Sequence, residues 1–347
     1  MSVDSQHHNI VAIEAVHCPI PAFDLPKPHT YTLTQHQWTS QLELAPRIKD
    51  ATIIITTTIP LTAKELSTDL TPNLRLIVVM ATGTDCVDKE AARSRGIPVC
   101  NCPGTNVESV SEHAIGLYFA TRRKIVQLHY ATTAVPDDPG QDTEWKTTGS
   151  LHRRLRSKDG NAPVLCGRET LGVIGYGALG QRIAKVGEAL GMRVLIAERK
   201  GGQQQQQQPP REGRTAFDEV LREATVVILC LPRNPETVDL ITEGELKTMR
   251  PQTLLINVAR GGIVNEGALL EALKQGWIEG AATDVFAKEP AGRGDSPLLS
   301  AEAQGLNLVL TPHLAWLSED TLVNLQDAVK YTIERWCRGE TVNEISG

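Results

Sequence analysis

The chain has 347 residues and a mass of 37.8 kDa, enough for about two domains that each bury a core of their own. This length excludes a disulfide mini-protein, and 41% apolar with 22% charged residues excludes a disordered chain and a membrane protein. With 35 Lys and Arg against 41 Asp and Glu, the net charge is −6, so we expect neither nucleic acid nor a membrane surface as a partner.

The first third of the chain has the pattern of a small α/β domain. Short apolar runs alternate with segments of helical period, which is typical of parallel βαβ units. Strands are predicted at residues 11–16, 51–56, 74–81 and 97–102. A helix at 107–131 follows, long enough to cross from one domain to another, and the polar stretch 136–168 is predicted to be surface loop.

The pattern becomes more regular from Leu171 onward. Six strands are predicted, at residues 171–176, 193–198, 225–231, 254–259, 281–286 and 306–310. Six strands with helices between them describe a doubly wound nucleotide-binding sheet. Apolar side chains recur with a helical period after the first of these strands, and Gly191 is placed to end that helix. The last helix, opened by Ser318 as its N-cap, is predicted to return to the first domain.

Three features point to a cytoplasmic protein without a metal site. The N-terminus lacks the pattern of a secretory or transit peptide, and the seven cysteines are scattered, so we expect free thiols in a reducing compartment. The closely spaced Cys100 and Cys102 have no second pair nearby and are predicted to be ordinary strand-end thiols. The glutamine tract 203–208 is predicted to be a mobile loop because it cannot bury apolar surface.

A glycine-rich motif stands between the first strand and helix of the second half. Gly175, Gly177 and Gly180 have the spacing of a dinucleotide-binding turn, in which the first glycine makes the turn, the second admits the pyrophosphate and the third allows close packing. The phosphates are expected at the helix N-terminus, which attracts anions. Glu198, at the end of the next strand, is placed to accept hydrogen bonds from the adenosine ribose.

The residues around Glu198 favour NAD as the cofactor over NADP. A carboxylate there repels the 2′-phosphate of NADP. Arg199 and Lys200 follow directly and are either in reach of such a phosphate or solvated residues beside the glutamine tract. The sequence leaves both interpretations open.

Three further segments follow later strands of the same predicted sheet and carry Arg260, Glu289 and His313. Each residue alone is explained by an ordinary role, as a surface cation, a loop carboxylate and a structural histidine. Ligands bind at the carboxyl ends of the strands in open α/β sheets, and all three segments lie there. Their joint placement therefore predicts a catalytic site beside the nicotinamide.

These motifs closely resemble the D-isomer-specific 2-hydroxyacid dehydrogenases, from the region of Met80 to the final helix. The match is nearest to the glycerate dehydrogenase, or hydroxypyruvate reductase, branch because of residues 175–181, residues 191–198 and Trp316. The resemblance implies two Rossmann-like parallel-sheet domains: a flavodoxin-like substrate domain of residues 1–104 and 315–347, and an NAD-binding domain of residues 105–314. It also implies a homodimer that associates through the cofactor domain.

The resemblance assigns roles to individual residues as well. Arg260, Glu289 and His313 would be the catalytic residues, and Asp284 would hold the nicotinamide carboxamide. The cofactor contacts implied are Thr82, Gly175, Gly177, Ala178, Leu179, Gly180, Glu198, Ala259 and Asp284. The substrate contacts implied are Ala81, Thr82, Gly83, Arg260, His313 and Trp316. The loop at 81–83 would receive the substrate carboxylate through its backbone amides, and Trp316 either walls the pocket or packs between the domains.

Reduction of a 2-keto acid requires residues of these types independently of any family. The nicotinamide supplies a hydride, the developing alkoxide needs a proton, and the carboxylate and carbonyl oxygens need a cation. Arg260 offers a planar fork for those oxygens. His313 is the proton donor, since an unperturbed histidine has a pKa of about 6.5, and Glu289 would orient the ring.

Alternative functions remain at this point. A corepressor-like binding protein of the same fold would use NAD to control assembly rather than for turnover. Phosphoglycerate dehydrogenase is less favoured because little chain follows the last helix, and formate dehydrogenase because its chemistry needs no Glu–His pair. The sequence does not separate hydroxypyruvate from glyoxylate as substrate.

Overall fold

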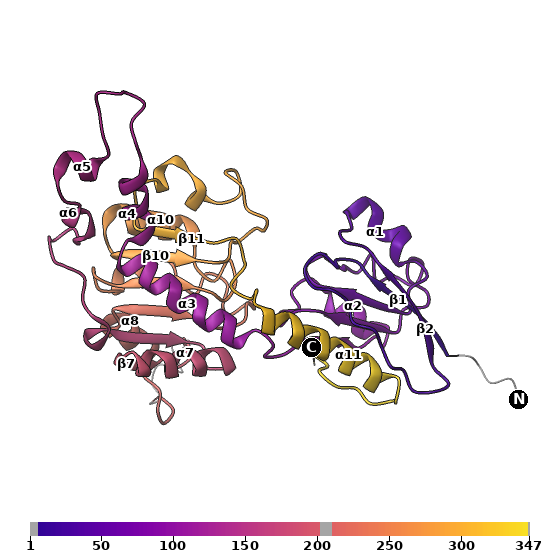
Figure 1. Cartoon of the computed structure of the whole chain (residues 1–347). Helices are drawn as coiled ribbons and strands as arrows, with labels where there is room; N and C mark the ends of the chain where they lie inside the picture. The colour runs from indigo at the N-terminus through magenta and orange to yellow at the C-terminus, as the bar shows by residue number, and fades with distance from the viewer. Residues whose placement is uncertain (1–5, 202–209, 346–347) are drawn as a thin grey trace, which may run out of the picture. The chain divides into compact units, whose positions relative to one another are not determined.

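The computed structural model describes residues 6–201 and 210–345, and the chain divides into two compact units (Figure 1). Unit 1 consists of Met1–Asn106 and Leu317–Gly347, and unit 2 of Val107–Trp316. The glutamine tract 203–208, for which the sequence predicts a mobile loop, lies outside the described residues.

Unit 1 contains a five-stranded parallel sheet. Its strands are β1 (His7–Ala12), β2 (Thr30–Gln35), β3 (Ile53–Thr56), β4 (Leu76–Val79) and β5 (Val99–Cys100). Their order, β2-β1-β3-β4-β5, is the flavodoxin-like order expected for this domain. The helices are α1 (Gln41–Ile48), α2 (Lys89–Ser94) and α11 (Glu319–Trp336). Strands β3 and β4 are buried at every position, as parallel strands covered on both faces usually are.

The sequence predicted four of these strands and missed β2. This strand lies at the edge of the sheet, and its alternating polar residues stay partly exposed, so no continuous apolar run marks it. The last helix begins as predicted, because the Ser318 side chain accepts a hydrogen bond from the Thr321 amide. Helix α11 packs against β4, so the chain does return to the first domain.

Unit 2 contains all six predicted strands, in one parallel sheet. They are β6 (Thr170–Ile174), β7 (Arg193–Ile196), β8 (Val226–Leu229), β9 (Leu254–Asn257), β10 (Gly280–Thr283) and β11 (Leu308–Leu310). The order β11-β10-β9-β8-β6-β7 makes β6 the strand from which the chain proceeds to both sides. This arrangement is a doubly wound sheet with its switch point at β6, which confirms the predicted fold class.

Helices pack on the sheet of unit 2 through apolar faces. They are α3 (Val107–Arg122), α7 (Ala178–Ala189), α8 (Phe217–Glu223), α9 (Glu243–Thr248), α10 (Glu266–Gln275) and the short 3₁₀ turns Pro297–Leu299 and Ala301–Ala303. Helix α3 contacts α7, β9 and β10, so that it closes one side of the core.

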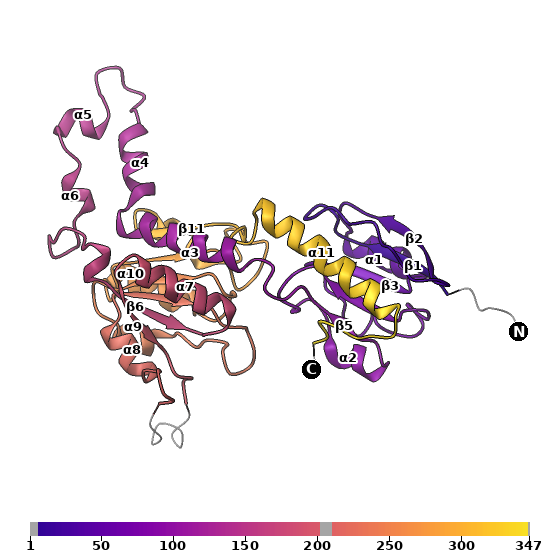
Figure 2. The same cartoon turned by 60° about the horizontal axis from the view of Figure 1, so that its bottom comes forward.

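Two predictions for residues 107–168 are wrong. The helix predicted at 107–131 is two helices, because the backbone of Lys124 turns into the left-handed region (φ +48°) between α3 and α4 (Ile125–Thr133). The stretch predicted as loop contains the short helices α5 (Glu144–Thr148) and α6 (His152–Leu155) and the 3₁₀ turn Cys166–Arg168. Figures 1 and 2 show α4, α5 and α6 as an arm that extends from the sheet of unit 2.

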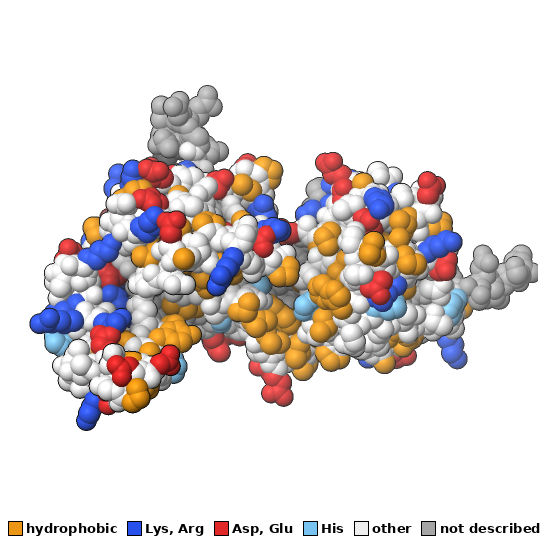
Figure 3. Space-filling view, turned by 90° about the horizontal axis from the view of Figure 1, so that it is seen from above, with side chains coloured by type: hydrophobic (Ala, Val, Ile, Leu, Met, Phe, Trp, Pro, Cys, Tyr) orange, Lys and Arg blue, Asp and Glu red, His pale blue; other side chains and the backbone are white. Residues whose placement is uncertain are grey.

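The surface mixes charges of both signs, as the net charge of −6 suggests. Lys and Arg side chains alternate with Asp and Glu side chains over the face shown in Figure 3. All seven cysteines are free thiols. Among the described residues, no helix has the length and apolar character needed to span a membrane.

Candidate active site

The glycine-rich loop joins β6 to the first turn of α7. Gly175 has a φ of +96°, and a Cβ atom there would overlap the carbonyl oxygen of Cys230. A Cβ atom on Gly180 would overlap the carbonyl oxygen of Gly175, so that helix and turn touch only because neither residue has a side chain. A Cβ atom on Gly177 would meet nothing within 4 Å. The loop is therefore close-packed at its first and third glycines and open at the second.

The second glycine, where the loop is open, lies at the start of α7. Gly177 is the N-cap residue and provides no side-chain hydrogen bond to the helix, and Ala178 and Leu179 form its first turn. The first amide groups of a helix have no partner within the helix. A dinucleotide pyrophosphate fits these features, because they combine room for phosphate oxygens with unpaired amides at the positive end of the helix dipole.

Glu198 follows β7 as predicted, but its carboxylate already has partners. The Arg211 guanidinium donates to both oxygens, at 2.8 and 2.6 Å, and the Arg199 amide donates at 2.8 Å. The Arg211 hydrogen bonds, with the amide bond of Arg199, lower the pKa of Glu198 to about 2. Lys200 instead pairs with Glu245 at 2.8 Å. The side chain that offsets the charge of Glu198 is thus Arg211, which the sequence did not single out.

Asp284 comes directly after β10 and is buried. Its carboxylate accepts hydrogen bonds from the Thr311 hydroxyl at 2.6 Å and from the amides of Leu314 and Ala315 at 3.0 and 2.9 Å. Its carbonyl oxygen accepts the His313 amide at 2.7 Å. These four contacts tie the segment after β11 to the end of β10 and fix the backbone on both sides of His313.

His313 and Glu289 form a hydrogen-bonded pair at this edge of the sheet. The distance from Nδ1 of His313 to Oε2 of Glu289 is 2.6 Å, and the other oxygen of Glu289 accepts the Phe286 amide at 2.8 Å. Burial opposes ionisation of Glu289, but the hydrogen bond and charge of His313 outweigh it and the pKa of Glu289 is lowered. Glu289 therefore stays ionised near neutral pH.

The backbone of His313 is held in a conformation that few side chains adopt. Its φ is +55°, in the left-handed region where non-glycine residues are uncommon. The side chain is 42% exposed, and Nε2 makes no hydrogen bond within the part of the chain that the structure describes. The pair thus presents one ring nitrogen outward while the other is fixed on a carboxylate.

Arg260 is placed at the same edge by the turn after β9. The Asn257 side chain holds this turn, since it accepts the Ala259 amide at 3.0 Å and donates to the Arg260 carbonyl at 2.9 Å. Gly261 packs directly on the carbonyl of Phe286, where any Cβ atom would overlap. The charge of Arg260 also contributes to lowering the pKa of Glu289. The structure thus brings the loops that carry Arg260, Glu289 and His313 to one edge of the sheet.

The predicted substrate loop lies in unit 1, after β4. The Thr82 hydroxyl donates to the Cys102 carbonyl and the Asn106 side chain, and its carbonyl accepts the Asn101 side chain at 2.7 Å. The Ala81 carbonyl accepts a hydrogen bond from the Cys102 amide, which fixes Ala81 in place. The amides of Thr82 and Gly83 donate to no acceptor among the described residues. The loop therefore has free backbone donors at the carboxyl end of its sheet.

The sequence of unit 2 matches a known family over most of its length. Residues 141–315 match the model described as D-isomer specific 2-hydroxyacid dehydrogenase, NAD binding domain. The chain belongs to the D-isomer-specific 2-hydroxyacid dehydrogenases. It is thus an oxidoreductase that acts on the CH–OH group of 2-hydroxy acids, with NAD as its cofactor, as the motifs predicted.

Relatives from this dehydrogenase family extend the match to nearly the whole chain. The chain is 37% identical to a glycerate dehydrogenase from Methylorubrum extorquens, over 92% of both proteins. It is 35% identical to a glyoxylate reductase from Aeropyrum pernix, over 73% of this chain and 70% of that protein. The structure of an NADPH-dependent glyoxylate/hydroxypyruvate reductase from Sinorhizobium meliloti, complexed with citrate, superimposes with a TM-score of 0.71 at 25% identity and covers 98% of both chains.

Sequence reasoning missed the residues that support this dehydrogenase site. Thr311 links Asp284 to His113 of α3, whose Nε2 lies 3.0 Å from the Thr311 hydroxyl. These contacts tie helix α3 to the segment that carries His313. Asn257 also gave no signal, because a polar residue at a strand end has many ordinary explanations. Trp316 packs partly buried against the apolar cluster that includes α3.

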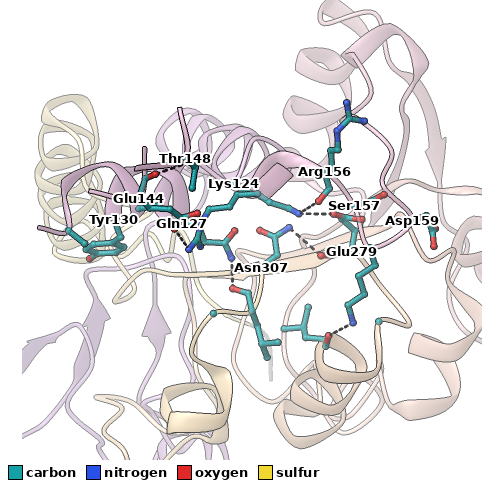
Figure 4. Close-up of a pocket in the computed structure, with 18 of the residues that line it drawn as sticks. Lys124, Gln127, Tyr130, Glu144, Thr148, Arg156, Ser157, Asp159, Glu279 and Asn307 are labelled. Atoms are coloured by element: carbon teal, nitrogen blue, oxygen red, sulfur yellow. Dashed lines mark hydrogen bonds and ion pairs between the residues drawn. The ribbon is translucent and has the colours of Figure 1, made fainter. Parts of the chain in front are cut away.

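A hollow in unit 2 lies away from these residues. It has a volume of about 1140 Å³ and is bounded by the arm and by residues that precede strands, among them Glu279 before β10 and Asn307 before β11 (Figure 4). Within this hollow, Lys124 forms an ion pair with Glu279, with Nζ of the lysine 3.3 Å from Oε1 of the glutamate. Ligands of doubly wound sheets bind at the carboxyl ends of the strands, and this hollow lies at the amino ends. It is not the dehydrogenase site.

Proposed function

We propose that this enzyme is a glycerate dehydrogenase or hydroxypyruvate (glyoxylate) reductase, which reduces a small 2-keto acid to the D-2-hydroxy acid with NADH. The observation that carries the proposal is the 2.6 Å bond between His313 and Glu289, on the sheet that holds the glycine-rich loop. A carboxylate that stays ionised beside an outward-facing imidazole is the arrangement that acid–base catalysis needs. The glycerate dehydrogenase and glyoxylate reductase among the relatives support this substrate class.

Different residues of unit 2 have different roles in this reaction. The glycine-rich loop and the start of α7 would hold NAD, whose nicotinamide would supply or accept the hydride. Arg260 binds the carboxylate and polarises the carbonyl through its planar fork. His313 donates the proton from Nε2 to the developing alkoxide and takes it back in the reverse direction. Glu289 holds the ring by Nδ1 and compensates its positive charge.

Other residues act by positioning these groups. Asp284 and Thr311 hold the loop of His313 in its left-handed turn, and Asn257 holds the turn of Arg260. Besides the contact to the nicotinamide carboxamide implied by the resemblance, Asp284 therefore has a positioning role that its hydrogen bonds support. Ala259, buried beside Arg260, would also contact the cofactor. In unit 1, the free amides of Thr82 and Gly83 suit a carboxylate of the substrate.

We also propose that the enzyme is a cytoplasmic homodimer that associates through unit 2. The arm carries several large apolar side chains that are exposed, including Ile125, Tyr130, Val135 and Trp145. Exposed apolar groups concentrated on one projecting segment are typical of an interaction surface. The seven free thiols suit a reducing compartment. Sedimentation velocity tests the dimer: a chain that remains a monomer at micromolar concentration contradicts it.

The substrate assignment is tested by steady-state kinetics with hydroxypyruvate, glyoxylate, pyruvate and phosphohydroxypyruvate, each with NADH and with NADPH. We expect hydroxypyruvate or glyoxylate with NADH to give the highest kcat/KM. A preference for pyruvate or for the phosphorylated acid would overturn the assignment. Negligible turnover with every acid, together with NAD-dependent assembly, would instead favour a binding protein.

A further inference from the structure

A cluster of nitrogen and sulfur ligands lies in unit 1, apart from the residues assigned to the dehydrogenase reaction. One ring nitrogen from His8, one from His29 and the sulfur of Cys337 all lie within 4.8 Å of one another. His8 belongs to β1, His29 directly precedes β2, and Cys337 directly follows α11. We propose that His8, His29 and Cys337 form a binding site for a divalent transition metal ion, with Zn²⁺ as the preferred occupant.

The fold brings these three residues together through firm local contacts. Strands β1 and β2 pair in parallel with His8 opposite Tyr31, so that the residue before β2 lies beside β1. His29 is fixed by its amide, which donates to the Pro26 carbonyl at 2.9 Å. The end of α11 reaches the same end of unit 1 (Figures 1 and 2), where Trp336 packs edge-on against the His8 ring at 5.4 Å. The ligands thus come from three elements already held in place.

The distances suit one ion with a small adjustment of side chains. Zn²⁺ binds imidazole nitrogen at about 2.0–2.1 Å and thiolate sulfur at about 2.3 Å, which sets its tetrahedral ligand atoms about 3.3–3.8 Å apart. The rings of His8 and His29 are stacked, with Nε2 of His8 2.9 Å from Nδ1 of His29. Side-chain rotations that change the separations of the ligand atoms by up to about 1–1.5 Å would lengthen this contact and shorten the wider ones.

The burial of His8 also suits a bound ion. The residue is only 2% exposed. Its Nδ1 atom is buried without a hydrogen-bond partner among the described residues, so one ring nitrogen of His8 is open to a ligand. Binding would release the thiol proton of Cys337 to solvent, and the thiolate would offset the charge of Arg75.

The donor set distinguishes the class of metal. Two imidazoles and a thiolate are borderline and soft ligands, which favour Zn²⁺, Co²⁺ or Ni²⁺ over Mg²⁺ or Ca²⁺. Of the three residues, His29 is partly exposed, so solvent can supply a fourth ligand. The ion would join the first two strands of the sheet to the last helix. Its role would be to stabilise unit 1, since none of these residues belongs to the proposed catalytic machinery.

The test uses the full chain without a histidine tag. The chain is stripped with a chelator, loaded with Zn²⁺, dialysed and analysed for metal, and a second sample is loaded with Co²⁺. We expect one metal ion per chain, the visible absorption of tetrahedral Co²⁺ and a near-ultraviolet thiolate-to-cobalt band. Zn²⁺ should raise the melting temperature of the loaded chain. Absence of retained metal, or a Co²⁺ spectrum without the thiolate band, would overturn the proposal.

Variants decide whether these residues are the ligands. His29→Ala and Cys337→Ser should each weaken Zn²⁺ binding by about tenfold or more, since even supporting residues of metal sites act on that scale. The matched controls are His7→Ala, an exposed neighbour on β1, and Cys166→Ser, a partly exposed thiol of unit 2. If Cys337→Ser does not fold, His29→Ala alone decides. Unchanged binding in His29→Ala would mean that the two histidines are only a hydrogen-bonded pair.

Discussion

The two edges of the unit 2 sheet each carry a carboxylate paired with a basic side chain, but in different surroundings. At the amino edge, Arg122 donates to Glu169 at 2.7 and 3.2 Å, and the two residues are 6% and 1% exposed. At the carboxyl edge, His313 bonds to Glu289 at 2.6 Å with its ring 42% exposed. The first pair is sealed among backbone carbonyls, and the second opens to solvent.

This difference separates a structural pair from a chemical one. The guanidinium of Arg122 also donates to the carbonyls of Thr225 and Gln252, so it joins α3 to the starts of β8 and β9. An arginine does not release its proton in proteins, and this one has no access to a ligand. His313 instead leaves one ring nitrogen exposed. The same sheet thus carries one pair placed for stability and one placed for the proton transfer that we propose.

Replacement of His313 should have the largest effect on activity. His313→Ala removes the proton donor, and we expect kcat/KM for keto-acid reduction to fall by about 10²–10⁴-fold while NADH binding is retained. Stopped-flow kinetics and fluorescence titration of NADH measure the two quantities. The control is His152→Ala, an exposed histidine of α6. A loss of less than about tenfold, with chemistry shown to be rate-limiting, would contradict the assigned role.

Replacement of Arg122 should have the largest effect on stability. Arg122→Ala leaves Glu169 buried without its cation, and we expect the free energy of unfolding to fall by about 3–5 kcal/mol. Urea denaturation followed by circular dichroism measures it. The adjacent Arg123→Ala is the control, because Arg123 is exposed. If Arg122→Ala and Arg123→Ala lower the free energy of unfolding by the same amount, the pair of Arg122 and Glu169 does not stabilise the fold.

Replacement of Glu289 should change the pH dependence of the reaction. Glu289→Gln keeps a hydrogen-bond acceptor but removes the charge that favours the protonated ring. In the proposed mechanism, the protonated ring of His313 donates the proton during reduction, and the neutral ring accepts it during oxidation. The fall of reduction with rising pH should therefore move to lower pH, and oxidation of the alcohol should persist to lower pH.

Profiles of kcat/KM against pH in both directions test this shift. The control is Glu302→Gln, which removes an exposed carboxylate paired with Lys274 at 2.5 Å. Profiles that coincide with those of the unmodified enzyme would show that Glu289 does not act through the ring.

The smallest expected effect concerns the cofactor. Arg211→Ala frees the carboxylate of Glu198 to accept ribose hydroxyls and to repel a 2′-phosphate, so the ratio of kcat/KM for NADPH to that for NADH should fall by up to about fivefold, the scale of an exposed ion pair. The control is Arg193→Ala, which breaks an exposed pair with Glu223 at the other end of β7. A rise in the ratio would mean that Arg211 hinders the phosphate instead of offsetting Glu198.

Much of this architecture could be predicted because its signals are local. Each strand of unit 2 left a recognisable apolar run in the sequence, and the glycine spacing fixed the nucleotide loop. Strand β2 lacks such a run because it is an exposed edge, and the break at Lys124 follows from a backbone conformation that no sequence period reveals. Candidate catalytic residues could be found because each lies three to six residues after the end of a strand.

By itself, the sequence determined where strands end, which reactive side chains follow them and which family the chain resembles. Only the tertiary structure decided which of these side chains meet. The bond of Glu289 to His313, the capture of Glu198 by Arg211 and the cluster of His8, His29 and Cys337 all join residues that are distant in the chain. The strength of such contacts depends on distance and burial, and these are set by packing of the whole unit rather than by any local pattern.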